Sequence, residues 1–196
     1  MTARILVSLL ALVAGTAAHA QDAAARQPKR WGGALQIDLS SGGDDLHDLG
    51  SDTNMTLGQG LTLSGGVFFR PVDHSNFELQ ILAGFKDAEP LPVVGGPFTD
   101  VSRWVFQVLA DYRSTDKWFV GGGLVLHGNP KVWSDFVGDP DIHFDDAVGA
   151  VIEGGWNWVG LQCTYIQYHN ASVGTFDGSN CGVRFTFHFR KWRPAN

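Results

Sequence analysis

Apolar residues alternate with small or polar residues along most of the chain between Trp31 and Phe189. Alternation with a period of two is typical of β-strands with two different faces, and no segment shows the apolar spacing of a convincing amphipathic helix. Stretches rich in Gly, Asp, Pro, Asn and Ser separate the alternating segments. We count eight predicted strands, at 31–40, 57–70, 77–86, 101–113, 118–127, 147–158, 159–169 and 181–189.

Sorting the positions of each predicted strand by parity gives two unlike faces. One face is apolar and carries no charge, with Phe106, Val108 and Ile152 as typical members. The other face combines glycine with polar and ionised side chains. Its acids are Asp38, Glu78, Asp111 and Glu153, and its bases are Arg70, Lys86, Arg103, Arg113 and Arg184.

The volume of a small barrel indicates which face is the inner one. The interior of an eight-stranded barrel is just wide enough for packed side chains, so the many rings of the apolar face do not fit inside easily. Turned outward, that face requires lipid, where a closed barrel satisfies every backbone polar group. We therefore predict an all-β fold, an eight-stranded antiparallel transmembrane β-barrel over 31–189.

The positions of aromatic residues and the lengths of the connections support this prediction. If the first strand starts on one side, almost every strand places a ring at that same side, as in the aromatic girdle of a membrane barrel. The predicted girdle residues are Trp31, Phe69, Phe77, Tyr112, Trp118, Trp156 and Phe189. Connections on the girdle side are short, whereas those on the other side are long (40–56, 87–100, 127–144 and 169–180), which is the pattern of outer-membrane barrels.

The beginning of the chain has the features of a secretory signal peptide. Arg4 is followed by an apolar stretch and then by Ala18, His19 and Ala20, which fit the small-x-small cleavage rule. We predict a signal peptide over 1–20, a flexible leader over 21–30 and a C-terminal tail over 190–196.

Composition excludes several other classes of protein. Glycine supplies 25 of 196 residues, about twice the usual ~7%, so the fold needs many positions without side chains. A net charge of −6 argues against binding to nucleic acid. No apolar run reaches the ~18 residues of a membrane-spanning helix.

With these features the chain resembles the small eight-stranded outer-membrane β-barrel proteins of Gram-negative bacteria. The final strand, VRFTFHF, looks like the C-terminal signal that such proteins present to the barrel-assembly machinery, although here RKWRPAN follows Phe189. The resemblance implies residence in the outer membrane after signal-peptide cleavage. It also implies contact with outer-membrane lipid and lipopolysaccharide, and a structural or surface-interaction role.

The charged residues of the inner face are expected to pair with one another. An unpaired buried charge costs several kcal/mol, so a salt-bridged network that closes the bore is favoured over an ion pathway. The predicted lumen network consists of Asp38, Glu78, Lys86, Arg103, Asp111, Arg113, Glu153 and Arg184.

Two alternative functions remain open at this stage. Some proteins of the resembled family are lipid A-modifying acyl hydrolases with a His and a Ser at the outer rim, and His169, Ser172 and Asp177 are the residues available here. Their spacing is unfavourable, because residues three apart on a strand face opposite sides. The other alternative is a soluble periplasmic ligand-binding barrel. We expect no enzymatic activity and no cofactor.

The long loops and the two cysteines give weaker signals. The loops are acidic, with Asp44, Asp45, Asp48 and Asp52 in the first and Asp135, Asp139, Asp141, Asp145 and Asp146 in the third. They lack the fixed spacing of an EF-hand, so no metal site is predicted. A hairpin centred on residues 174 and 175 places Cys163 opposite about Phe185, so we expect Cys163 and Cys181 not to be bonded.

Overall fold

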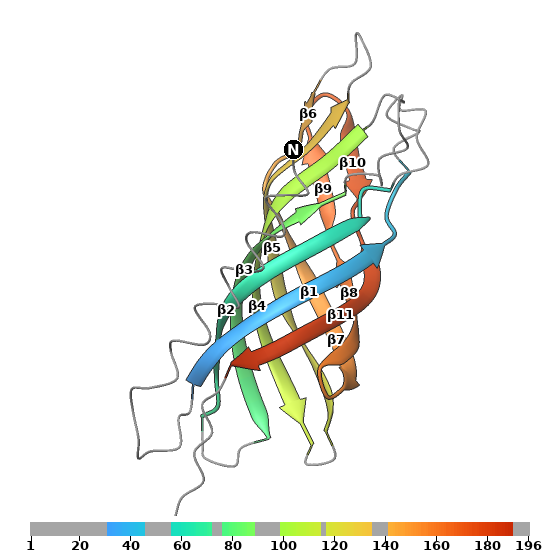
Figure 1. Cartoon of the computed structure of the whole chain (residues 1–196). Coiled ribbons are helices and arrows are strands. Elements are labelled where there is room, and N and C mark those ends of the chain that lie inside the picture. The colour runs from blue at the N-terminus through green and yellow to red at the C-terminus, as the bar shows by residue number, and fades with distance from the viewer. Residues whose placement is uncertain are drawn as a thin grey trace, which may run out of the picture.

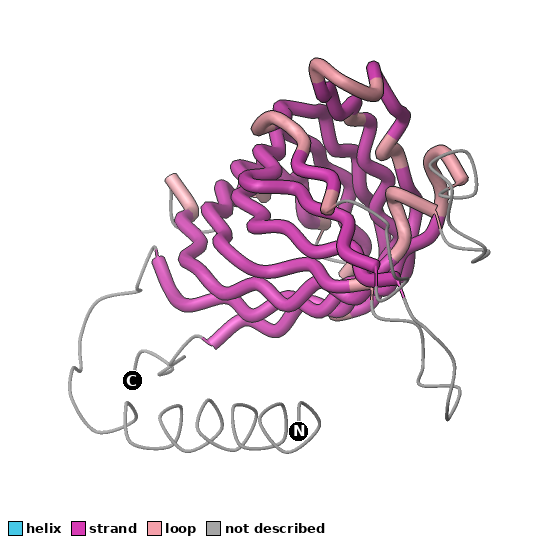
Figure 2. The backbone as a smooth tube through the Cα atoms, turned by 90° about the horizontal axis from the view of Figure 1, so that it is seen from above, coloured by secondary structure: helices cyan, strands magenta, loops and turns pink. Residues whose placement is uncertain are grey.

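The computed structural model describes residues 31–45, 56–71, 76–88, 99–114, 117–134 and 141–189. The predicted signal peptide, leader and C-terminal tail lie outside these residues and stay predictions. The described part of the chain contains strands and loops without a helix (Figure 2). Accordingly, none of it forms a helix long and apolar enough to cross a membrane.

Eight long strands close into one antiparallel barrel, which confirms the predicted fold (Figure 1). The strands are β1 (Trp31–Ser41), β2 (Gly60–Phe69), β3 (Phe77–Asp87), β4 (Thr99–Arg113), β5 (Trp118–Ser134), β7 (Ala147–Trp156), β8 (Val159–Tyr165) and β11 (Asn180–Phe189). Each pairs with the next along this series, and β1 pairs with β11 to close the ring. No barrel strand is left with an unpaired edge.

Three short strands lie at one end of the barrel (Figure 1). β6 (Ile142–His143) pairs with the last part of β5, while β9 (Gln167–Asn170) and β10 (Gly174–Asp177) form a separate hairpin. We call this the loop end. The opposite end, the turn end, holds the turn at 157–158, the last residues of β2, β4 and β11 and the first residues of β1, β3 and β5.

The fifth strand is longer than its sequence predicts. We expected it to finish at His127, but β5 continues to Ser134, opposite the beginning of β4. The register shifts between the pairs Ser102–Lys131 and Trp104–Gly128, so β5 contains a β-bulge around Asn129, whose φ is 49°. Pro130 follows, at the kind of position where a strand tolerates proline. The proline and the Asn made this segment look like a loop.

Side chains alternate between an exposed outer face and a buried inner face. Val148 and Ile152 are 69% and 68% exposed, whereas Gln36 on an inward position is 1% exposed. The inner face also carries apolar side chains that the parity analysis did not assign to it. These are Ala34, Phe68, Leu82, Val105, Leu109, Phe119, Val125 and Val151. The interior is therefore a mixed core of ionised, polar, apolar and glycine positions.

Candidate functional site: the barrel interior and its outer belt

Glu78 on β3 is the centre of a charge cluster near the turn end. Its carboxylate accepts hydrogen bonds from Arg70 (3.0 Å) and Arg113 (2.8 Å) and lies 2.9 Å from Nε2 of His188. Arg113 also reaches Asp111 at 3.2 Å and lies over the ring of Phe119. The Glu78 side chain is fully buried, whereas those of Arg113, His188 and Arg70 are 15%, 20% and 33% exposed, so the cluster is buried at its centre and partly exposed at its edge.

A second layer crosses the middle of the barrel. Arg184 on β11 forms an ion pair with Glu153 on β7, and both side chains are fully buried. Gln162 of the intervening strand β8 donates to Glu153 at 2.9 Å. Nε2 of Gln36 and Nε2 of Gln107 lie 3.4 and 3.5 Å from Oε1 of Gln162. Side chains from five strands thus meet in one polar layer.

Glycines provide the space for these inward side chains. Gly121 stands between Asp111 on β4 and Glu153 on β7, and Gly123 stands between Leu109 and Val151 on the same strands. A Cβ atom added at Gly123 would collide with the carbonyl oxygen of Val108 on the neighbouring strand. The high glycine content therefore reflects the close approach of strands around a narrow, filled bore.

A third group of residues, the upper cluster, lies closer to the loop end. It consists of Lys86, Arg103, His127 and Tyr168, all less than 4% exposed. Lys86 donates to Oγ of Ser40 (2.6 Å) and to the carbonyl oxygen of Gly58 (2.7 Å). Nδ1 of His127 lies 2.5 Å from the Tyr168 hydroxyl. Burial raises the pKa of the Tyr168 phenol.

An apolar cluster packs above these polar residues at the loop end. The rings of Tyr168 and Phe144 lie 5.8 Å apart, and that of Phe176 lies 5.9 Å from Phe144. Ile142 and Ile166 pack against the same group. Residues of β6, β9 and β10 therefore extend the core of the barrel into its mouth.

All eight residues of the predicted lumen network occupy inward positions. Seven are buried and Arg113 is partly buried. Five of them, Glu78, Asp111, Arg113, Glu153 and Arg184, make the ion pairs described above. Asp38 stands directly across from Arg184 in the β1–β11 ladder. Lys86 and Arg103 stand apart from the ion pairs, in the upper cluster.

The seven predicted girdle residues lie together at the turn end, on the outer face. Six are 40–63% exposed and Tyr112 is partly buried between the rings of Phe77 (5.6 Å) and Trp118 (5.4 Å). The prediction left a gap at β8, which Trp158 fills from the preceding turn by stacking on Phe185. Trp158 stands immediately before the predicted strand 159–169, and this position is the sequence signal that could have identified it as a girdle residue.

A second set of exposed rings lies on the outer face nearer the loop end, and parity analysis did not single it out. Trp104 and Phe85 pack edge to face with ring centroids 5.3 Å apart, and Tyr165 is 64% exposed. Exposed Leu, Val and Ile residues fill the surface between the two sets of rings. We call the whole surface the apolar belt.

The expectation that the cysteines are not bonded is wrong, because Cys163 and Cys181 form a disulfide. The two residues face each other directly in the β8–β11 ladder, with Cα atoms 4.1 Å apart. The hairpin turns at residues 171–173 and not at 174–175, because Asn170 pairs with Gly174. Oδ1 of Asn170 accepts the backbone N–H of Ser172 at 2.7 Å, which stabilises this tighter turn.

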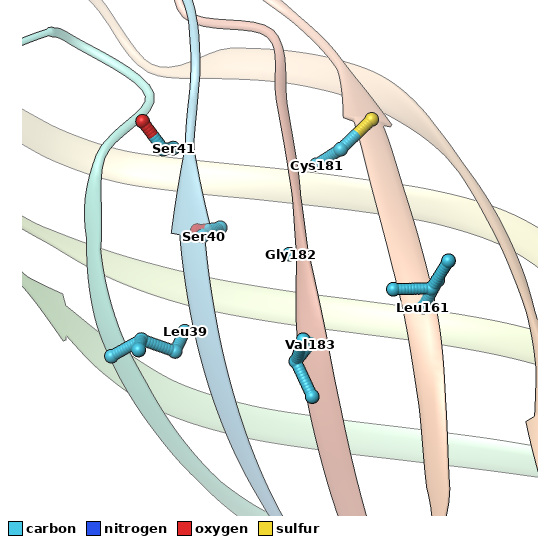
Figure 3. A pocket seen from close by; sticks show the side chains of 7 residues that line it. All are labelled: Leu39, Ser40, Ser41, Leu161, Cys181, Gly182 and Val183. Atoms are coloured by element: carbon cyan, nitrogen blue, oxygen red, sulfur yellow. The ribbon is translucent and has the colours of Figure 1, made fainter.

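A shallow groove lies on the outer wall below this disulfide (Figure 3). Leu39, Val183 and Leu161 project from the neighbouring strands β1, β11 and β8 as one row along its edge, with Ser41 and Cys181 above them. Ser40 and Gly182 also line the groove. The groove belongs to the apolar belt and is not an entrance to the interior.

The structure does not bring the candidate residues of the acyl hydrolase alternative together in a reactive arrangement. Nδ1 of His169 bonds Oγ1 of Thr175 across the β9–β10 hairpin at 3.0 Å. Ser172 lies on the exposed tip of that hairpin. Asp177 accepts the backbone N–H of Ser179 at 2.9 Å. Each candidate thus has a local structural partner.

The acidic loops form no metal site within the described residues. No group of three or more His, Cys, Asp or Glu side chains there could hold a metal ion. Asp146 instead accepts the backbone N–H of Asn129 at 2.8 Å, and Asp44 accepts that of Asp177 at 2.7 Å. Asp48, Asp52, Asp135 and Asp139 lie outside the described residues.

No family model and no curated protein matches the sequence. The solved structures to which the chain shows a likeness include the following three. Ail, the attachment invasion locus protein of Yersinia pestis, crystallised with a heparin analogue, is 11% identical over 81% of this chain and 100% of its own (TM-score 0.44). Neisserial surface protein A is 13% identical over 83% and 100% (TM-score 0.43). The N-terminal β-barrel domain of OprF from Pseudomonas aeruginosa is 17% identical over 79% and 97% (TM-score 0.30). These low values transfer no function.

Proposed function

We propose that the protein is an outer-membrane β-barrel of a Gram-negative bacterium that serves a structural or surface-interaction role through its loop end. The observation that carries this proposal is the apolar belt. Contiguous exposed apolar surface is rare on soluble monomers, whose largest patches cover a few hundred Å². Here exposed Trp, Phe, Leu, Val and Ile side chains occur on all eight barrel strands.

The length of the strands supports a membrane-spanning position. β1, β2, β7 and β11 contain 10 or 11 residues each. A strand of that length extends over about 34 Å, and a tilt of about 45° reduces its height to about 24 Å, close to the ~25 Å apolar band of outer-membrane barrels. The two sets of aromatic side chains are then at the levels of the two membrane interfaces.

The polar interior argues against a soluble barrel that binds an apolar ligand and against a solute pore. A ligand-binding barrel needs an apolar cavity, whereas here ion pairs and glutamines cross the bore. We propose that the lumen network closes the bore and that function resides in the loops. The partners in this proposal are outer-membrane lipid and lipopolysaccharide, the barrel-assembly machinery during insertion, and an external partner at the loops.

A pair of matched substitutions tests the membrane position. Val108 lies in the apolar belt and is 55% exposed, whereas Val173 lies at the tip of the β9–β10 hairpin and is 41% exposed. A lipid-facing arginine near the midplane costs about 2–4 kcal/mol, but an arginine in a water-exposed loop costs almost nothing. Val108→Arg should therefore reduce the yield of folded barrel in outer-membrane fractions, and Val173→Arg should not.

Heat-modifiable mobility on a gel measures the folded fraction, and fractionation of cells measures its location. Recovery of wild-type protein from a detergent-free periplasmic extract, or equal yields of both variants, would refute the proposal.

A further inference from the structure

The inward positions of the barrel hold one more base than acid. Five basic side chains (Arg70, Lys86, Arg103, Arg113 and Arg184) face four acidic ones (Asp38, Glu78, Asp111 and Glu153), a difference of 5 − 4 = +1 without the histidines. A buried charge without a partner is costly, by several kcal/mol. The position of the surplus positive charge therefore indicates where the interior lacks a negatively charged partner.

The turn-end and middle layers are balanced. Arg70, Arg113 and Arg184 make ion pairs with Glu78, Asp111 and Glu153, three bases with three acids. The surplus therefore lies in the upper cluster, where Asp38 interacts with Lys86 and none of the described acids forms an ion pair with Arg103. Lys86, Arg103 and His127 lie close enough to interact electrostatically with one another.

Arg103 is the member of the upper cluster whose hydrogen-bond donors are not all used. Its side chain is 1% exposed, and its one hydrogen bond, from Nη2 to the carbonyl oxygen of Gln59, is long at 3.5 Å. The Nε and Nη1 donors have no hydrogen-bond partner among the described residues. In contrast, Lys86 already donates to Ser40 and Gly58. The Arg103 guanidinium thus combines uncompensated charge with unused N–H groups.

We propose that Arg103 binds a small inorganic oxyanion of the phosphate or sulfate type inside the loop end of the barrel. A guanidinium matches such an ion in charge and in hydrogen-bond donors. Lys86 adds a second positive charge, and His127 lies beside it. Tyr168 and Phe144 pack above Arg103 at the loop end of the interior. Because these rings cover the site, it takes a free ion and not the headgroup of a membrane lipid.

Titration calorimetry on the folded mature protein in neutral detergent tests the proposal. Sodium phosphate or sodium sulfate is added at constant ionic strength, which sodium chloride maintains. We expect saturable binding of one ion per barrel. Absence of saturable binding at millimolar concentrations would overturn the proposal, as would binding of phosphate-bearing lipid in mixed micelles but not of the free ion.

Variants of two arginines locate the ion. Arg103→Gln removes the charge and the guanidinium group and leaves only amide donors. It should raise the dissociation constant by about tenfold or more, the usual effect of losing one charge-assisted hydrogen bond. Arg70→Gln is the matched control at the turn end, where the side chain is 33% exposed and bound to Glu78, and should bind as wild type does. Unchanged affinity in Arg103→Gln would refute the assignment.

Heat-modifiable mobility shows whether each variant is folded. If Arg103→Gln does not fold, Arg103→Lys replaces it, because lysine keeps the charge and loses the guanidinium donors. We expect Arg103→Lys to bind the ion more weakly than wild type. Affinity equal to that of the wild type would contradict a guanidinium-centred site.

Discussion

Replacing Gly123 by alanine tests whether inward glycines are required by the close approach of neighbouring strands. A Cβ at this position would lie 2.9 Å from Cα of Leu109 and from the carbonyl carbon of Val108, and still closer to the carbonyl oxygen of Val108. All three atoms belong to the backbone of β4, which the ladder with β5 holds in place. The added methyl group therefore cannot be accommodated by a side-chain rotation.

Gly65 on β2 is the matched control. It points outward, and the nearest atom to a Cβ added there is 4.0 Å away. Overpacking a filled core costs about 1–3 kcal/mol. At an open site, alanine stabilises by about 0.4–1 kcal/mol, because it restricts the unfolded chain. Because both variants restrict the unfolded chain alike, that gain cancels in the comparison, and Gly123→Ala should be less stable than Gly65→Ala by about 1–3 kcal/mol, the cost of overpacking.

Urea unfolding of the refolded proteins in detergent micelles or lipid vesicles, followed by tryptophan fluorescence and heat-modifiable mobility, measures this difference. Both variants replace glycine by alanine, so the contributions of strand propensity and of side-chain chemistry cancel in the difference between their free energies of unfolding. Free energies of unfolding within 0.5 kcal/mol of each other, about the usual error of additivity, would show that the inward glycines are not held by steric contact.

Three further results are expected. Glu153→Gln should destabilise the barrel by about 3–5 kcal/mol, because it leaves Arg184 buried without its ion-pair partner. In urea unfolding, the double variant Glu153→Gln with Arg184→Met should recover much of that loss. If the losses of stability of the two single variants simply add in the double variant, the pairing is contradicted. Replacing Cys163 and Cys181 together by serine should lower the free energy of unfolding by about 3 kcal/mol, since the disulfide closes a loop with a sequence separation of 18. Equal stability of the wild-type protein with and without a reducing agent would contradict this. Planar-bilayer recordings of the purified protein should show no steady unit conductance, and stable open levels would disprove the closed bore.

The fold could be predicted from sequence because the two faces of each strand are chemically unlike. Slipping a strand by one residue would place Ile81 or Val108 in a crowded interior and Gln80 or Gln107 in the apolar belt, so the pattern specifies which face of each strand is inward. The predicted strands accordingly overlap the eight barrel strands. The charged inward residues could be assigned for the same reason.

The details that prediction missed depend on local backbone geometry. The position of one turn decided whether Cys163 faced Cys181 or Phe185, and a shift of two residues in the turn reversed the conclusion about the disulfide. The pairing of Lys86 with Ser40 and Gly58 depends on the path of the first loop, which periodicity does not describe. Apolar inward residues such as Phe68 were missed because a chain of mixed composition hides a few core positions within a polar face.

The bulge at Asn129 divides β5 into two parts, and residues of opposite parity face the interior in the two parts. Between Trp118 and His127 the odd-numbered residues face the interior, whereas beyond the bulge the even-numbered Val132 is buried. One inserted residue therefore separates the barrel wall, whose residues alternate between the apolar belt and the bore, from the mouth, whose residues pack in a small core of their own. Exchange of the segment beyond the bulge would leave the inward and outward assignment of every wall residue unchanged, so the mouth of this barrel can diversify while its wall is preserved.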